Sequence, residues 1–207
     1  MPYPLFPTAY CPPIAYMALL AHYPHASIER CETFPKQTYR NRCEILTGNG
    51  PMILSVPTVR TNGNHTLTGD MKISYAEHWN IKHLRAITAA YNASPYFLYY
   101  QDGLEKILLQ PYEHLIDLNM ALLTFLLQKM KIATTIELTN DFVAPQEMDA
   151  NDFRYTLSPK LPCPIEIPPY DQVFADRFPF HPNLSSLDLL FNMGPDSKRY
   201  LEQIILP

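Results

Sequence analysis

Glycine is scarce in this chain, and the short signatures that identify many common enzymes are missing. Its 207 residues include 6 glycines, and no GxGxxG, GxxxxGK[ST], GxSxG or HExxH motif occurs. Glycine-rich loops let a backbone approach phosphates closely, and HExxH places two zinc-binding histidines on one helix face. These absences exclude the common nucleotide-binding loops, the hydrolase nucleophile turn and the zinc-protease site. We predict no metal site and no cofactor.

Excess positive charge and long apolar runs are also lacking. The net charge is -4, and no run of lysine and arginine exceeds two residues, so the chain has no electrostatic footprint for nucleic acid. The most apolar stretch, residues 115–130, contains Asp117, Asn119, Gln128 and Lys129. It falls short of the roughly 20 apolar residues that a bilayer requires. It predicts a buried helix, and no membrane span is expected.

The N-terminal segment does not resemble a signal peptide, because it has no basic region and prolines interrupt its apolar residues. The four cysteines form no CxxC pair and have no zinc-ligand spacing. We therefore expect reduced thiols and a cytoplasmic location. The oligomeric state is not predicted.

Proline is abundant, with 21 residues that cluster near both ends of the chain. Proline fixes φ and removes a backbone donor, which predicts rigid extended connections in those regions. The length fits one domain over residues 1–207 and is sufficient to bury a core.

Periodicity and turn residues predict an α/β fold shading towards α+β, in which a mixed sheet combines with helices. An N-terminal βαβ unit opens the chain, a β-hairpin follows around Gly48-Asn49-Gly50-Pro51, a central segment is helical, and short helices lie near the C-terminus. The predicted strands are 3–10, 26–31, 40–47, 52–56 and 134–138. The predicted helices are 14–22, 79–92, 96–109, 113–130, 185–193 and 195–205.

The first candidate site is the run Tyr39-Arg40-Asn41-Arg42. Alternation along a strand would place Arg40, Arg42 and Glu44 on one face. Two arginines so spaced can clamp a phosphate or carboxylate by forked hydrogen bonding. The alternative is a solvated strand face without a ligand.

The second candidate lies on the predicted helix 79–92. His78, Lys82 and Arg85 share its polar side, and His83 lies one turn beyond Trp79, so ring stacking would position it. His83 is thus a candidate catalytic residue. A solvated basic face is the alternative, and the spacing of the two histidines does not suit a metal.

The third candidate is the segment from His181 to Asn192. Ser185 followed by Asp188 is typical of a helix capping box, which is the structural interpretation. A helix N-terminus also attracts anions, so Asn183 and Asp188 are candidate ligand-binding residues. His181 and Asp188 are candidates for acid–base chemistry.

These segments resemble the WbqC-like family, bacterial proteins associated with O-antigen and surface-polysaccharide gene clusters. The resemblance runs along the chain, and the segments that carry it are Tyr10 with Pro12-Pro13, residues 39–43, Asn49-Gly50, the Trp79 helix, residues 152–160 and residues 182–192. Many members carry a His-Gln-Pro sequence on the first strand. Here the matching stretch, residues 6–10, contains no histidine. An activity that used that histidine would be lost or would rely on another group.

The resemblance implies a cytoplasmic bacterial protein of surface-polysaccharide assembly that acts on a nucleotide sugar or another anionic small molecule. One hypothesis is a transferase that moves an acyl or aminoacyl group to an activated sugar. It predicts one pocket that unites Tyr39, Arg40, Asn41 and Arg42 with the Asn183/Asp188 region. The alternative is a noncatalytic binding or assembly protein, in which the same residues would form an interface.

Overall fold

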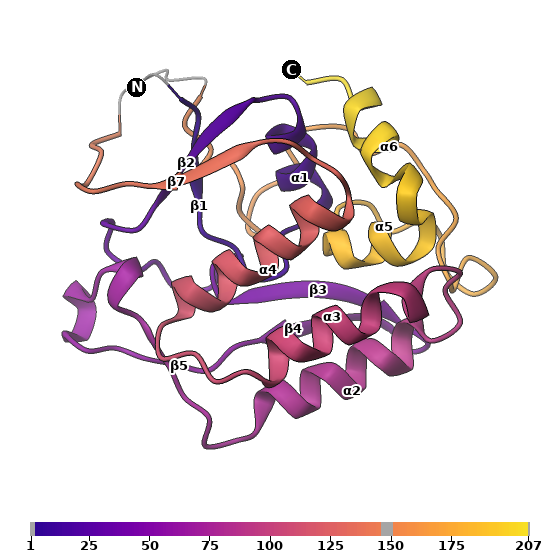
Figure 1. Ribbon diagram of the computed structural model, residues 1–207, viewed down its shortest axis with the longest axis horizontal. Coiled ribbons are helices and arrows are strands. Elements are labelled where there is room, and N and C mark those ends of the chain that lie inside the picture. The colour runs from indigo at the N-terminus through magenta and orange to yellow at the C-terminus, as the bar shows by residue number, and fades with distance from the viewer. Residues whose placement is uncertain (1–2, 146–150, 207) are drawn as a thin grey trace.

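The computed structural model describes residues 3–145 and 151–206. A parallel β-sheet, a β-hairpin and a set of helices make up the architecture (Figure 1). The strands are β1 Leu5–Pro7, β2 His25–Glu29, β3 Arg42–Thr47, β4 Gly50–Ser55, β5 Thr58–Val59, β6 Lys72–Ile73 and β7 Thr135–Leu138. The helices are α1 Ile14–Ala21, α2 Trp79–Tyr91, α3 Phe97–Leu109, α4 Leu115–Lys129, α5 Ser186–Met193 and α6 Ser197–Gln203.

The predicted α/β class and the N-terminal βαβ unit are confirmed. β1 and β2 pair in parallel across the connecting helix α1, and β7 adds to the other edge of β2, also in parallel. The strands do not form one mixed sheet, however. The order β1-β2-β7 makes a purely parallel sheet, whereas β3 with β4 and β5 with β6 form two separate antiparallel pairs.

The hairpin and the central helices follow the predicted positions closely, because turn residues and prolines mark their ends. Near the C-terminus, the predicted helix 195–205 is divided into a 3-10 turn, Gly194–Asp196, and α6. Residues 58–68, which fall outside the predicted helices and strands, include the short strand β5 and a 3-10 turn.

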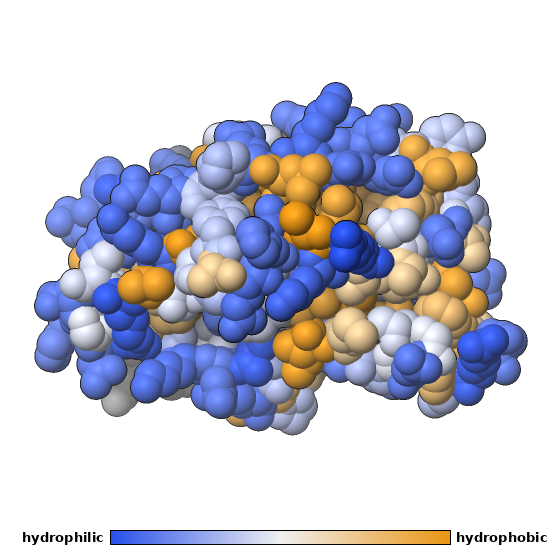
Figure 2. All heavy atoms as spheres, turned by 90° about the horizontal axis from the view of Figure 1, so that it is seen from below, coloured by the Kyte–Doolittle hydropathy of each residue, from blue (hydrophilic) through white to orange (hydrophobic). Residues whose placement is uncertain are grey.

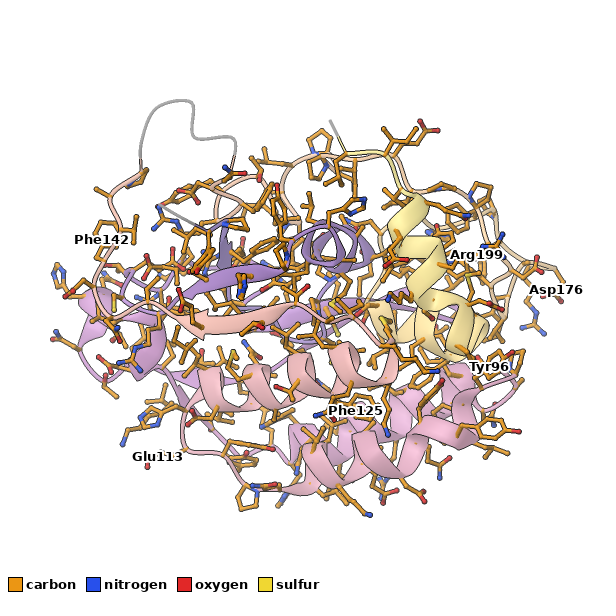
Figure 3. All side chains as sticks on the ribbon, turned by 45° about the horizontal axis from the view of Figure 1, so that its top comes forward. Tyr96, Glu113, Phe125, Phe142, Asp176 and Arg199 are labelled. Atoms are coloured by element: carbon orange, nitrogen blue, oxygen red, sulfur yellow. The ribbon has the colours of Figure 1, made fainter. Side chains whose placement is uncertain are left out.

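The helices pack in layers that bury the core. α4 lies between the parallel sheet and α3, and α3 contacts α2 (Figures 1 and 3). Nine of the residues in α4 are buried, as the apolar run predicts. α1 is buried along nearly its whole length and contacts α5 and α6. Within the described residues, no helix has both the length and the apolar character needed to cross a membrane.

The face seen from below carries apolar side chains scattered among polar ones (Figure 2). α2 and α3 lie at this lower side of the molecule in Figure 1. The exposed large apolar residues of these two helices are Ile81, Leu98, Tyr99 and Leu109.

A close contact at Gly194 joins the C-terminal helices to the start of α3. Gly194 has a φ of +53°, and a Cβ added there would lie 2.5 Å from the ring of Tyr96, a residue labelled in Figure 3. Gly63 has a similar φ of +49°, but an added Cβ would meet nothing within 4 Å. The pair therefore compares a positive-φ glycine that has a close steric neighbour with one that has none.

We predict that Gly194→Ala lowers the free energy of unfolding by about 3 kcal/mol, whereas Gly63→Ala costs about 1 kcal/mol. Both variants pay for the positive φ, but only the first also forces the Tyr96 ring to move. Urea denaturation of the two variants measures the difference. Equal losses would contradict the proposed contact.

Candidate functional site

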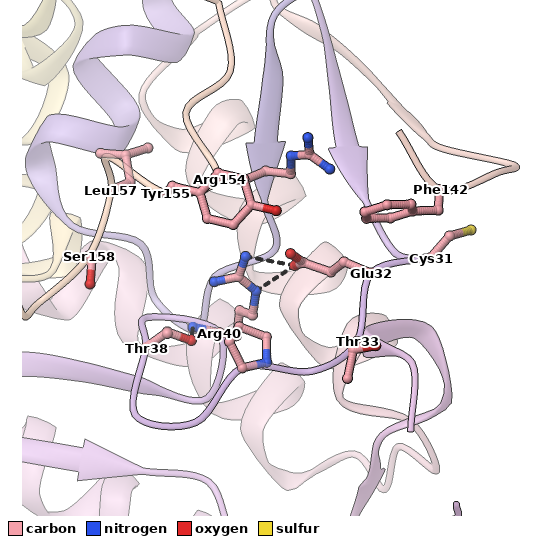
Figure 4. Close-up of a pocket in the computed structure, with 11 residues that line it drawn as sticks. Cys31, Glu32, Thr33, Thr38, Arg40, Phe142, Arg154, Tyr155, Leu157 and Ser158 are labelled. Atoms are coloured by element: carbon pink, nitrogen blue, oxygen red, sulfur yellow. Dashed lines mark hydrogen bonds and ion pairs between the residues drawn. The ribbon is translucent and has the colours of Figure 1, made fainter. Parts of the chain in front are cut away.

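A cavity of about 470 Å³ lies beyond the carboxyl ends of the parallel strands. Because parallel strands end at one edge of a sheet, the segments that follow β2 and β7 meet there, and ligands of open α/β sheets commonly bind at this edge. Figure 4 shows strand arrowheads that point towards the cavity. The lining residues are Cys31, Glu32, Thr33, Pro35, Thr38, Arg40, Phe142, Arg154, Tyr155, Leu157 and Ser158.

Arg154 is held between two carboxylates at one wall of the cavity. Its Nε and Nη2 donate to the two oxygens of Asp152 at 2.9 and 2.6 Å, and its Nη1 donates to Glu29 Oε2 at 2.9 Å. Nη1 also donates to the carbonyl of Val143 at 2.7 Å. These bonds occupy most of the donors of the guanidinium group. Arg154 therefore serves chiefly to hold the wall in place.

Glu29, the last residue of β2, is fully buried and accepts hydrogen bonds on both oxygens. The backbone N–H of Cys31 and the hydroxyl of Thr139 donate to Oε1, each at 2.7 Å, while Oε2 receives Arg154. A buried carboxylate requires such partners, because desolvation without them is costly. Glu29 thereby joins the ends of β2 and β7.

Arg40 and Glu32 form a second buried pair, drawn with dashed lines in Figure 4. The Nε of Arg40 donates to Glu32 Oε1 at 2.6 Å, and Nη2 lies equally near this oxygen but without hydrogen-bond geometry. Burial raises the pKa of Glu32, and the neighbouring Arg40 opposes the shift. Among the described residues, neither Glu32 Oε2 nor Arg40 Nη1 has a hydrogen-bond partner. Both residues line the cavity, so these two atoms are available to a ligand there.

Two half-exposed aromatic rings border the same space. Phe142 is 52% exposed and Tyr155 is 50% exposed, and both rings lie against Arg154, with the guanidinium carbon 5.8 and 5.3 Å from the ring centroids. The hydroxyl-bearing residues Thr33 and Ser158 also line the cavity. Aromatic faces beside polar groups suit a ligand with both apolar and hydroxyl-bearing surfaces. Three carboxylates, Glu29, Glu32 and Asp152, contact the two arginines, which leaves no unpaired positive charge here for a multiply charged anion.

In a comparison with protein-family models, residues 8–158 match the WbqC-like protein family. The chain belongs to the WbqC-like family. All residues that line the cavity lie within the matched range. No curated protein and no solved structure matches the chain.

The four residues of the first candidate run separate into different surroundings in this WbqC-like protein. β3 begins only at Arg42, and the chain turns before it, with Gln37 at a φ of +59°. Arg40 and Arg42 therefore do not share a strand face as expected. Arg40 lines the cavity described above, whereas Tyr39 and Arg42 line a different one. Asn41 donates to the carbonyl of Val56 at 3.1 Å and so secures the hairpin.

Asn183 and Asp188 lie outside the range matched to the WbqC-like family and outside the cavity. Asn183 accepts a hydrogen bond from the backbone N–H of Ala15 at 2.9 Å, which satisfies a free donor at the start of α1. Asp188 is buried and accepts from Tyr91 at 2.9 Å and from Tyr170 at 2.5 Å. Burial raises its pKa. The predicted single pocket with Arg42 is not formed, because Asp188 pairs with phenols rather than with an arginine.

The capping interpretation of Ser185 is confirmed in part. Its hydroxyl accepts from the backbone N–H of Leu187 at 3.3 Å, as an N-cap does. Asp188 does not complete the box, because the N–H of Ser185 donates to the carbonyl of Glu44 instead. The backbone N–H and carbonyl of His181 both bond to the side chain of Gln172, whose Nε2 also donates to Asp188 Oδ1 at 3.3 Å.

His83 is buried beside aromatic rings. Its ring centroid is 5.1 Å from that of Trp79, as the sequence spacing suggested, and its Nδ1 lies 2.9 Å from the hydroxyl of Tyr10. Burial lowers the pKa of His83 to about 4, although a backbone hydrogen bond at Ser55 opposes the shift. A ring that is neutral at pH 7 and absent from the cavity lining fits a structural position.

The residues that line the cavity but were not among the predicted site residues include Glu32, Phe142, Arg154 and Tyr155. Glu29 and Asp152, which hold Arg154, were not predicted either. One local signal was available, because Glu29 is the last residue of a strand and Glu32 follows three residues later, at the carboxyl end where ligands of such sheets bind. Among the described residues, no group of three or more histidine, cysteine, aspartate or glutamate side chains is placed to hold a metal ion.

The low pKa of His83 predicts a pH-dependent stability. Its folded-state pKa of about 4 lies below the ordinary value of about 6.5, so between these values the unfolded chain binds a proton that the folded protein does not. The free energy of unfolding should therefore fall as pH falls from about 6.5 towards 4. Denaturant titrations across this range measure the slope.

His83→Gln should reduce that slope, and the exposed residue His65 offers the control His65→Gln. NMR titration of the His83 ring should show a midpoint near 4. A slope that is the same in both variants would show that His83 does not cause it.

Proposed function

We propose that this WbqC-like protein is a cytoplasmic transferase of bacterial surface-polysaccharide biosynthesis that acts on an activated sugar. The chain's membership of the family supports the biological setting, because the resemblance noted from the sequence implies a link to O-antigen gene clusters. The observation that carries the proposal is the cavity at the carboxyl edge of the sheet, where Glu32 and Arg40 each retain one free polar atom between two aromatic rings.

The sugar ring of the substrate would occupy the space beside Phe142 and Tyr155. A pyranose has an apolar C–H face that packs on aromatic rings and a rim of hydroxyl groups that needs donors and acceptors. Thr33 and Ser158 bring such groups to the cavity, together with Glu32. Because both arginines of this cavity are paired with carboxylates, the cavity suits the sugar part of the substrate better than a phosphate group.

In the proposed reaction, Glu32 and Arg40 would assist acyl transfer to a sugar amine or hydroxyl. The sugar nitrogen or oxygen would bond to the carbonyl carbon of an activated acyl donor, such as a thioester, while its proton passes to Glu32 Oε2. The leaving group would depart with its bonding electrons. The free Nη1 of Arg40 would donate to the oxygen on which negative charge develops. The raised pKa of Glu32 makes it a stronger base than an ordinary carboxylate.

This assignment does not require the histidine that many family members carry on the first strand. The matching stretch leaves β1 at the same edge of the sheet, and there Thr8 accepts a hydrogen bond from Asn119 at 3.1 Å. Asn119 also donates to the carbonyl of Arg40 at 2.8 Å. In this chain a carboxylate, Glu32, takes the role of proton acceptor.

Replacing the aromatic rings should weaken ligand binding without unfolding the protein. We predict that Phe142→Ala and Tyr155→Ala each weaken the binding of nucleotide sugars at least about 10-fold. Stacking of a ligand ring on an aromatic side chain contributes about 1–3 kcal/mol for nucleic-acid bases. Ligand-observed NMR with a panel of nucleotide sugars measures this.

The control is Tyr99→Ala, a ring on α3 that is 79% exposed and lies outside the cavity. It should leave binding unchanged. Unaltered affinity in all three variants would exclude the cavity as the sugar site.

Glu32→Gln separates a transferase from a binding protein. The amide keeps the shape of the side chain but cannot accept the substrate proton, so transfer to the sugar should fall at least about 100-fold while sugar affinity changes little. Single-turnover transfer and binding are measured on the same folded preparation. Binding that persists in the wild-type protein, with no transfer from any activated acyl donor, would favour the noncatalytic alternative.

A further inference from the structure

A second cavity, of about 330 Å³, lies on the other side of the run that carries Arg40. Alternate residues of this run line the two spaces: Thr38 and Arg40 line the first cavity, and Gln37, Tyr39 and Arg42 line the second. The segment 157–160 divides in the same way. Leu157 and Ser158 border the first cavity, and Pro159 and Lys160 border the second. The segments 37–42 and 157–160 thus form a wall between the cavities.

Arg42 differs from the two arginines at the first cavity because its charge is not paired. Among the described residues, no carboxylate oxygen lies within 4.0 Å of its guanidinium nitrogens, and its Nε is buried without a hydrogen-bond partner. Arg40 and Arg154 by contrast each contact a carboxylate at 2.6 Å. Burying an arginine N–H without an acceptor destabilises the protein. An anionic ligand would supply both the acceptor and the opposite charge.

Lys160 adds a second positive charge to this cavity. It is exposed, and its ammonium group donates to the carbonyl of Lys36 at 3.2 Å, which leaves further N–H donors for a ligand. Glu44 supplies the opposing charge, so the lining carries two positive groups and one negative group. The lining of the first cavity has the same count, but both of its arginines are paired with carboxylates, whereas among the described residues neither Arg42 nor Lys160 is in an ion pair.

Tyr39 provides a neutral donor beside Arg42. Burial raises the pKa of Tyr39 to about 12, with Glu44 adding to the shift and Arg42 opposing it. The phenol therefore keeps its proton at neutral pH and is available to donate a hydrogen bond. Gln37 contributes a side-chain amide at the same cavity.

We propose that the second cavity is a binding site for a phosphate-type anion, held by Arg42 and Lys160 with Tyr39 as a further donor. The planar fork of Arg42 suits two phosphate oxygens, and lysine binds phosphate as a point charge. This site stands on its own observations and does not depend on sugar transfer at the first cavity. A phosphate group of a larger molecule and free inorganic phosphate share the same recognition chemistry.

Arginine-detected NMR tests the proposal with inorganic phosphate and with pyrophosphate as probes, at constant ionic strength. In the wild-type protein the Nε–H resonance of Arg42 should shift and saturate with phosphate. Arg42→Gln should weaken phosphate binding at least about 10-fold, and Arg42→Lys should weaken it less, because the charge remains but the fork is lost. The matched control is Arg199→Gln, an exposed position on α6 (Figure 3) that should not change the affinity.

Lys160→Gln provides a second measurement at an exposed position, and we expect it to weaken binding at least about 3-fold even if Arg42→Gln fails to fold. Tyr155→Ala, at the first cavity, should leave phosphate affinity unchanged. The phosphate proposal can therefore be rejected without rejecting the sugar site, and the reverse also holds. A phosphate response that does not saturate, or that is equal in Arg42→Gln and Arg199→Gln, would overturn the proposal.

Discussion

The buried contact of Arg154 with Glu29 and Asp152 is the interaction on which the candidate site depends. It joins the end of β2 to a segment more than a hundred residues later, which runs beside β1 through the hydrogen bond from Leu5 N–H to the carbonyl of Asn151. Removing one partner of such a buried network typically costs about 3–5 kcal/mol, because a charge is left without compensation. The cavity therefore has a rigid wall before any ligand enters it.

Two buried arginine–glutamate pairs border the cavity, and they differ in how many of their polar atoms are already bonded. The Arg154 network is nearly saturated with protein partners, and the Arg40–Glu32 pair is not. A saturated ion pair holds structure, whereas a pair with one free donor and one free acceptor can exchange solvent for substrate at little cost. Both pairs border the same cavity, so the groups proposed to act on a substrate lie beside a wall that the Arg154 network holds in place.

Local signals in the sequence were sufficient for most of the fold and for only part of the site. The βαβ unit, the hairpin and the central helices follow from periodicity, proline and glycine, which act over a few residues. Arg40 was identified as a site residue, but its partner Glu32 was not, because the turn before β3 is set by tertiary contacts. The hydrogen bonds of Asp188 also could not be predicted from local sequence, since its partner Tyr91 lies 97 residues away in the chain.

The start of α1 is completed by residues from the far end of the described chain. The backbone N–H of Ile14 donates to the carbonyl of Leu184, Ala15 donates to Asn183, and the N–H of Ser186 donates to the carbonyl of Pro12. During synthesis, therefore, the first helix emerges long before its capping groups are made. Contacts of such high sequence separation form late and slow the final ordering of a fold. The βαβ unit must wait for residues 183–186 to leave the ribosome before its first helix has a complete set of backbone hydrogen bonds.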